Sequence, residues 1–235
     1  TSIWQGAFTA VNCSCQTGFA FTPPGRENGF SGRDFRREPP LEMPPIDFKG
    51  VQQGMVMDVY DDRVVFKRFE FKNGRSLGAD WVVPIGPGAD KPYRFDTRFN
   101  EKRRPAFPKG AKIRVSQKDG HFRGKGGMKP SEETHAQIVV SFPPATTAGG
   151  ADIRAWDYAV RLEEDCGDHL RTVSERFYFS PNSLMGEEDE REPVVCAFPR
   201  TDLPEKSRAF YRFTVTPRSC WGHEGKPISS SWERF

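Results

Sequence analysis

The sequence predicts a mainly β fold. Of its 235 residues, 20 are proline and 22 are glycine, and this frequency favours short elements separated by turns. Few windows carry apolar residues at the spacing of an amphipathic helix, and none resembles a heptad repeat. Many segments instead alternate apolar and polar residues or are rich in β-branched and aromatic residues, as strands are. We therefore expect a protein built from sheets.

The clearest strand signal is a β-hairpin within residues 51–71. Its arms are Met55–Tyr60 and Val64–Phe71, and the polar residues Asp61-Asp62-Arg63 between them favour a turn. Apolar residues point to both sides of the first arm: Met55, Met57 and Val59 to one side, Val56 and Tyr60 to the other. A strand that is apolar on both sides is usually covered on both sides. The hairpin is therefore expected at the edge of a larger, layered sheet.

Two further strands and a long loop are predicted around the hairpin. Ala7–Val11 fits a short buried strand, and Ala79–Ile85 fits a strand that closes the first region. Residues 16–48 are rich in Pro and Gly, so that a solvated surface loop is expected there. The alternative is a rim that reaches an anionic ligand through four basic residues: Arg26, Arg33, Arg36 and Arg37.

Residues 89–235 predict an antiparallel β-sandwich, separated from residues 1–88 by a linker that begins at Gly86-Pro87-Gly88. Seven segments have the composition of strands: Tyr93–Phe99, Ala111–Gln117, Ala136–Phe142, Ile153–Glu163, Arg171–Phe179, Ala209–Pro217 and Ile228–Trp232. One of them alternates strictly, with Trp156, Tyr158, Val160 and Leu162 on one side and Asp157, Arg161 and Glu163 on the other. This pattern predicts one buried and one wet face. Tyr211 is a candidate for a tyrosine corner.

Residues that carry catalysis in other proteins are present but do not form catalytic patterns. The four histidines are scattered in predicted loops, and no two have metal-ligand spacing: His121, His135, His169 and His223. Gly120–Gly127 lacks the residue order and the strand-to-helix context of a phosphate loop. The acidic run Glu187–Glu192 lacks the staggered ligands of a calcium loop. No catalytic or substrate-binding residue is therefore assigned, and no metal ligand.

Composition excludes some classes of partner. The net charge is +3, from 35 basic and 32 acidic residues, which favours neither nucleic acid nor a membrane surface as a partner. No apolar run has the length of a membrane span, and no signal peptide is visible. The chain begins at Thr1, as a processed, truncated or fragmentary chain does. Five cysteines are present, and buried free thiols are expected in preference to the alternative of a structural disulfide: Cys13, Cys15, Cys166, Cys196 and Cys220.

Three stretches resemble a known protein family. TSIWQGAFTAVNC (residues 1–13) and GMVMDVYDDRVVFKRFEFKNG (residues 54–74) are similar to the end of a calcineurin-like metallophosphoesterase domain. In that family, a segment like Ser2–Ala10 follows a Gly-His-x-His motif, and a hairpin like Gly54–Phe71 closes one edge of the sheet in a four-layer α/β/β/α fold. Arg208–Ser231 resembles the last two strands of the fibronectin type III-like or Ig-like domain that sometimes follows the enzyme.

The resemblance implies the C-terminal portion of a phosphoric ester hydrolase that carries an accessory sandwich. The family holds a pair of divalent metal ions (Mn, Fe or Zn) that activates water, but the GDxxD, GNH and Gly-His-x-His motifs do not occur in this chain. The chain alone is therefore expected to be inactive. Its implied partners are the N-terminal catalytic part of the same protein and, for the whole enzyme, a phosphate ester.

Two further expectations concern location and class. A sandwich attached to a phosphoesterase favours a secreted or extracytoplasmic protein by association. The alternative function is an independent β-sandwich module that binds carbohydrate or protein. Its binding face would carry exposed aromatic residues such as Trp221 and Trp232.

Overall fold

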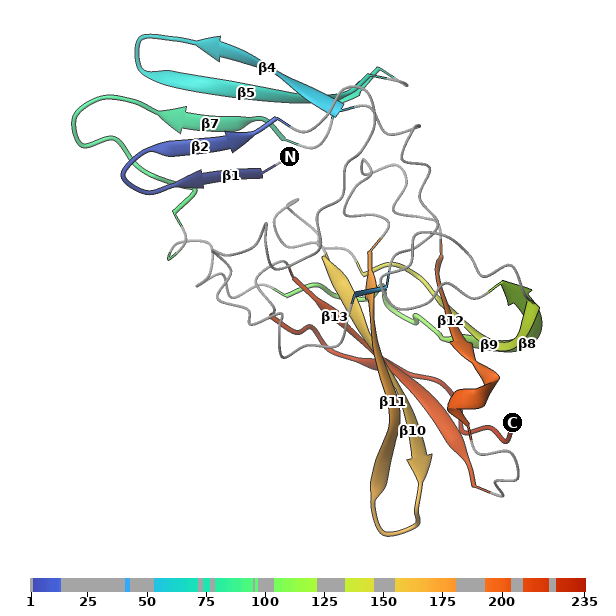
Figure 1. Cartoon of the computed structure of the whole chain (residues 1–235). Coiled ribbons are helices and arrows are strands. Elements are labelled where there is room, and N and C mark those ends of the chain that lie inside the picture. Colours follow the sequence, from blue (N-terminus) through green and yellow to red (C-terminus); the bar gives the residue numbers. More distant parts are fainter. Residues whose placement is uncertain are drawn as a thin grey trace.

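The structure, a computed structural model, confirms the mainly β fold (Figure 1). It describes residues 2–13, 41–42, 53–71, 74–76, 79–94, 96, 104–121, 134–145, 155–180, 193–203, 209–219 and 223–235. Strands make up more than half of these residues, and they form several sheets with mainly antiparallel pairing. In the described part of the chain, no helix combines the length and the apolar character that crossing a bilayer requires.

The chain begins with a hairpin of two short strands, β1 (Ser2–Gln5) and β2 (Thr9–Asn12). The predicted strand Ala7–Val11 overlaps β2 at residues 9–11, but Ala7 and Phe8 belong to the turn, and the segment is exposed or half-buried where burial was predicted. The Trp4 ring occupies the space where a Cβ of Gly6 would lie, so that only glycine fits this turn. Phe8 at the tip is 67% exposed, although its apolar side chain suggested burial.

The second sheet contains the predicted hairpin. It consists of β4 (Gln53–Val59), β5 (Arg63–Glu70), β6 (Arg75–Ser76) and β7 (Trp81–Pro84), and β5 pairs antiparallel with the other three. The turn at Asp61-Asp62-Arg63 is confirmed, since Tyr60 N donates to Arg63 O at 2.8 Å. The predicted strand at Ala79–Ile85 is confirmed as β7.

The β1–β2 hairpin packs against one side of this sheet. Its small core consists of Ile3, Trp81 and Val83, with five half-buried neighbours: Val11, Met55, Val64, Phe66 and Tyr93. Residues after the predicted linker return to this core, because Tyr93 N donates to Gln5 Oε1 at 3.0 Å and Gln5 N donates to Tyr93 O at 3.1 Å. Residues 91–94 therefore associate with the first strands.

Two further sheets face each other in the rest of the chain. One has the order β14 (Ile228–Ser229), β13 (Tyr211–Arg218), β10 (Asp157–Asp165), β11 (Leu170–Phe179) and β3 (Leu41–Glu42). The other has the order β12 (Val194–Pro199), β9 (Thr134–Phe142) and β8 (Arg114–His121). All their pairs are antiparallel except the β3–β11 pair. The predicted boundary at residue 88 stays a prediction, and β3 from the first 88 residues joins the later sheet.

Six of the seven strands predicted after residue 89 overlap with observed strands. The exception is Tyr93–Phe99, of which the described part forms only an isolated bridge between Arg94 and Gln5. The strand that was missed is β12, whose alternate residues Val194, Cys196 and Phe198 are buried. The sequence does show this alternation with a period of two. It was missed because the segment follows the acidic run directly and has a proline at each border, which disfavours a strand.

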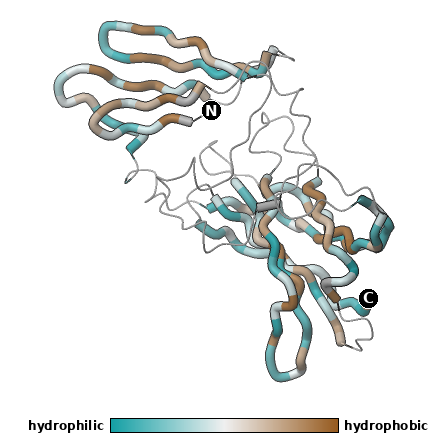
Figure 2. The backbone as a smooth tube through the Cα atoms, viewed as in Figure 1, coloured by the Kyte–Doolittle hydropathy of each residue, from teal (hydrophilic) through white to brown (hydrophobic). Residues whose placement is uncertain are grey.

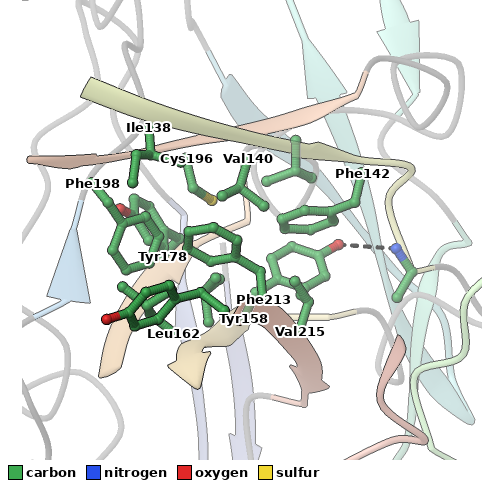
Figure 3. Close-up of a cluster of buried hydrophobic side chains, with 14 of the residues drawn as sticks. Ile138, Val140, Phe142, Tyr158, Leu162, Tyr178, Cys196, Phe198, Phe213 and Val215 are labelled. Atoms are coloured by element: carbon green, nitrogen blue, oxygen red, sulfur yellow. Dashed lines mark hydrogen bonds between the residues drawn. The ribbon is translucent and has the colours of Figure 1, made fainter. Parts of the chain in front are cut away.

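Aromatic residues fill the space between the two facing sheets (Figure 3). Phe142 packs edge-on against Tyr158 with ring centroids 5.0 Å apart, and Phe198 lies 5.1 Å from Phe213. The buried hydroxyl of Tyr158 accepts a hydrogen bond from Ala145 N at 3.0 Å. Tyr178 on β11 donates to Ala197 O on β12 at 2.7 Å and so links the two sheets directly. Figure 2 shows hydrophobic stretches along the strands of both parts of the molecule.

The wet face predicted for β10 is only half correct. Arg161 and Glu163 form ion pairs at the partly exposed end of the strand, with Glu175 at 2.5 Å and Arg212 at 2.8 Å. At the other end, Asp157 is fully buried and pairs with the buried Arg218. A carboxylate can occupy such a place because a guanidinium satisfies both of its oxygens. Trp156, predicted for the buried side, is half-buried and packs on the fully buried Phe179 with ring centroids 5.0 Å apart.

Tyr211 does not form a tyrosine corner. Its side chain is buried in the core, but its hydroxyl lies 3.4 Å from Glu164 Oε1. A tyrosine corner requires a bond to an upstream backbone group instead.

Candidate interaction surface on the hairpin sheet

The β4–β5–β7 sheet has two chemically different faces, which follow from its register. Met57, Phe66 and Trp81 lie opposite one another in one row across the three strands. Val59, Val64 and Val83 form the next row on the same side, because side chains two residues apart share a face. We call these six residues the apolar face.

The opposite side of the sheet carries charge. Lys67 Nζ lies 2.7 Å from Asp58 Oδ2 in a partly exposed ion pair. Its hydrogen bond with Asp58 and the attraction of that carboxylate raise the pKa of Lys67, and Asp80 adds a smaller contribution. We call this side the charged face, although three valines also lie on it: Val56 and Val82 are 48% and 41% exposed, and Val65, between Asp58 and Val82 in the register, is 9% exposed.

The prediction that the hairpin is apolar on both sides is confirmed for Val56, Val65 and Val82, but charged residues are interspersed among them. Along β4 alone, Val56 and Tyr60 suggest a second apolar side. Across the sheet, the same side also holds Lys67, and Arg63 stacks on the Tyr60 ring at 4.4 Å. The guanidinium of Arg63 also bonds to Asp62 at 2.8 Å. Period-two counting within one strand could not reveal which charged residues of the neighbouring strand share its face.

The apolar face is covered at one end and open at the other. Trp81 and Val83 on β7 are only 6% and 5% exposed, because the β1–β2 hairpin packs on them through Ile3. Phe66 and Val64 on β5 are half-buried. Met57 and Val59 on β4 are 58% and 66% exposed. Exposed large apolar residues on an edge strand are typical of a surface that another polypeptide covers.

The base of the hairpin is held by buried polar groups. Gln53 and Glu70 face each other in the β4–β5 register and are 4% and 5% exposed. Arg68 donates from Nη2 to Ala79 O at 2.8 Å, and its guanidinium lies 4.3 Å from the centre of the Trp81 ring. These contacts fix the hairpin on β7, so that the open end of the apolar face is presented in one defined position.

The histidines do not form a site. His121, His135 and His169 are exposed, and His169 Nδ1 lies 2.6 Å from Asp168. Burial lowers the pKa of His223, and the charge of Arg104 lowers it further. One D-x-H tripeptide, Asp119-Gly120-His121, occurs at the exposed end of β8 and was not recognised in the sequence. Among the described residues, no group of three or more His, Cys, Asp or Glu side chains is arranged to hold a metal ion.

Several predicted features lie outside the described residues. They are the basic residues of the long loop (Arg26, Arg33, Arg36 and Arg37), the acidic run Glu187–Glu192, Cys15, Cys220 and Trp221. Of the other cysteines, Cys196 is a buried free thiol as predicted, whereas Cys13 and Cys166 are free but exposed. Trp232, named for the alternative binding face, is half-buried and lies under Arg212 at 4.7 Å. That side chain does not offer an open stacking surface.

Comparisons with models of protein families, with curated proteins and with solved structures find no match. The arguments for function therefore come from the residues of this chain and from their arrangement.

Proposed function

We propose that this chain is the C-terminal portion of a metal-dependent phosphoric ester hydrolase of the calcineurin-like kind. Its hairpin sheet completes the sheet of the catalytic domain, and its facing sheets form an accessory fibronectin type III-like or Ig-like sandwich. The proposal is supported by the likeness of Ser2–Ala10 and Gly54–Phe71 to segments of that family and by the observed β1–β2 and β4–β5 hairpins at those residues.

The observation that carries the proposal is the incomplete core around the hairpin. On the side of the apolar face, the buried apolar residues in the described part are Ile3, Trp81 and Val83, and Val65 on the other face is 9% exposed, while Met57 and Val59 lie in water. Complete burial of one such side chain stabilises a fold by about 1.5–3 kcal/mol. A unit this small buries too little apolar surface to offset the entropy of ordering its strands. It is therefore expected to fold as part of a larger domain.

The strand order of the sandwich agrees with a domain of the proposed type. Numbered from β8 to β14, the first, second and fifth strands form one sheet, and the third, fourth, sixth and seventh form the other. In an immunoglobulin constant domain, the fourth strand belongs to the sheet of the first, second and fifth. Here it joins the third strand as β11, and β3 from the first part of the chain pairs with its other side, so that the two arrangements differ in the place of the fourth strand and in this added strand.

The metal chemistry belongs to the part of the enzyme that precedes this chain. The described residues do not fit a pair of divalent ions, because no three potential ligands converge. When bound, such a pair lowers the pKa of a bridging water and neutralises charge on the phosphoryl oxygens. The role of the present residues is to complete and support the sheet on which that site is built, and no reaction step is assigned to them.

The proposal is tested by reading the coding sequence upstream of Thr1. A Gly-His-x-His motif within a few tens of codons, with GNH and GDxxD motifs before it, is the expected result. A start codon and secretion signal directly before Thr1 would contradict the proposal. They would favour an independent module that binds carbohydrate or protein.

A further inference from the structure

We infer that two copies of this chain pair through the free edge of β4, so that their hairpin sheets join into one continuous antiparallel sheet. The two-fold axis passes through the joined sheet at Met57, which lies opposite Met57 of the second copy. The inference goes beyond the proposed function and does not depend on it, because the partner is the same chain and no catalytic residue takes part.

The edge of β4 is open from Met55 onward. Among the described strands, β4 pairs only with β5, and Figure 1 shows it at the outer margin of its sheet. Its first two residues are buried, whereas Val56, Met57 and Val59 are 48%, 58% and 66% exposed. β4 contains no proline and no basic residue, which are the residues that commonly protect a sheet edge. An unprotected edge of this kind is a template for another strand.

The hydrogen bonds of the hairpin show which backbone groups of β4 face the open edge. Tyr60 N donates to Arg63 O across the turn, so that these two residues form a hydrogen-bonded pair. Such pairs alternate with non-bonded pairs along an antiparallel ladder. The even-numbered residues of β4 therefore bond to β5. The N–H and C=O groups of the odd-numbered residues point to the open edge, and in the open segment these are Met55, Met57 and Val59.

Exposure and charge select one register for the new pairing. A two-fold axis perpendicular to the sheet can set Val56, Met57 or Asp58 opposite its own copy. An axis at Asp58 sets two carboxylates directly opposite each other, which is destabilising. An axis at Val56 requires the first two residues of β4, which are already buried. An axis at Met57 uses the open segment and matches Met55 with Val59, so that apolar side chains meet on one face of the joined sheet.

The same register is complementary in charge. Asp58 of one copy lies opposite Val56 of the other, and Val56 lies opposite Lys67 in the pairing of β4 with β5. Asp58 therefore shares a row with Lys67 of the second copy, in addition to its own ion pair with Lys67 at 2.7 Å. Two lysines flank the two aspartates at the axis, and the four charges balance.

The contact is expected to be weak and reversible. Stable, specific interfaces bury about 1,200–2,000 Å² of surface, and one pair of short strands buries less than this. Its stabilisation comes from new main-chain hydrogen bonds and from covering the exposed side chains of Met57 and Val59. The chain should therefore pass from monomer to dimer as its concentration rises.

Analytical ultracentrifugation of residues 1–235 tests the interface through the dissociation constant of the dimer. Met57→Lys sets two like charges opposite each other at the axis and should raise this constant by about tenfold or more. Val195→Lys is the matched control, because Val195 is 53% exposed on β12, an edge strand of another sheet. It should change the constant by less than about twofold. A chain that stays monomeric up to its solubility limit, or a dimer that Val195→Lys weakens as much, would overturn the inference.

Disulfide trapping tests the register. All cysteines except the buried Cys196 are first replaced by serine: Cys13, Cys15, Cys166 and Cys220. Only the residue on the axis lies opposite its own copy, with Cα atoms about 5.5 Å apart, and a disulfide can span this distance. Met57→Cys should therefore form a covalent dimer under mild oxidation.

Val59→Cys is the control for trapping by chance collisions. Position 59 is more exposed than position 57, at 66% against 58%. In the inferred register, however, the two copies of residue 59 lie about 13 Å apart along the strands, so that Val59→Cys should form at most about a tenth as much covalent dimer. No trapping of Met57→Cys, or equal trapping of the two variants, would overturn the inferred pairing.

Discussion

Removing the carboxylate of Asp157 is expected to destabilise the sandwich strongly. Asp157 is 0% exposed, and Arg218 is 5% exposed. The guanidinium donates to both carboxylate oxygens at 2.7 Å and lies 3.6 Å from the centre of the Phe177 ring. Asp157→Ala leaves this cation buried without its partner. Breaking a buried pair in this way lowers the free energy of unfolding by about 3–5 kcal/mol. Each kcal/mol lost lowers the melting temperature by roughly 2–4 °C in a protein of this size, so that the melting temperature should fall by roughly 10 °C.

The measurement is urea and thermal unfolding followed by circular dichroism. Glu175→Ala is the matched control, because it removes an ion pair of the same type, to Arg161 at 2.5 Å, whose side chains are 28% and 40% exposed. A partly exposed pair is expected to contribute at most about 1 kcal/mol.

A double variant separates the unpaired charge from the loss of packing. Asp157→Leu combined with Arg218→Met removes both charges and keeps apolar volume, so that most of the lost stability should return. If Asp157→Ala destabilises no more than Glu175→Ala does, the reasoning that this pair is desolvated is refuted.

Two further predictions concern the core and the hairpin. Phe213→Ala removes a ring that is 0% exposed and should lower the free energy of unfolding, measured in urea, by about 3–5 kcal/mol. Phe8→Ala removes a ring that is 67% exposed and should lower it by less than about 0.5 kcal/mol. Similar losses of stability in the two variants would contradict the assigned core. Asp58 raises the pKa of Lys67, so that the ion pair stabilises the folded hairpin at pH values below the ordinary pKa of lysine. As the pH rises through the higher pKa of the folded protein, Lys67 loses its proton and this stabilisation is lost. Asp58→Asn should lower the pKa of Lys67 measured by NMR titration, and an unchanged pKa would show that the two groups do not interact.

Strand positions in this protein could be predicted from local patterns. The hairpin of β4 and β5 was predicted from its turn residues and its β-branched arms, because both signals lie within a few residues of each other. The same local logic placed the start of β2 at Ala7 instead of Thr9, because Ala7 and Phe8 belong to the turn that follows Gly6. It failed at β12, whose alternation follows directly on a charged segment.

The chemical character of each face depends on long-range pairing and could not be predicted in full. Asp157 belongs to the wet side of β10 by alternation, but Arg218 arrives beside it from a strand about sixty residues later. Likewise, the open end of the apolar face is defined by where the β1–β2 hairpin packs on β7. Such contacts between distant segments have no signature within one strand. The apolar residues of the candidate surface were therefore predicted, but the charged residues that share each face with them were not.

Hydrolysis of a simple phosphate ester by two purified proteins tests the central claim most directly. Residues 1–235 and the longer protein with the upstream sequence are each assayed on p-nitrophenyl phosphate with Mn²⁺ or Zn²⁺ and again after chelation. Turnover is expected only in the longer protein and only with metal, because the described residues of this chain place no three metal ligands together. Metal-dependent turnover by residues 1–235 alone, retained through repeated purification, would contradict the claim that the catalytic site lies in the preceding part.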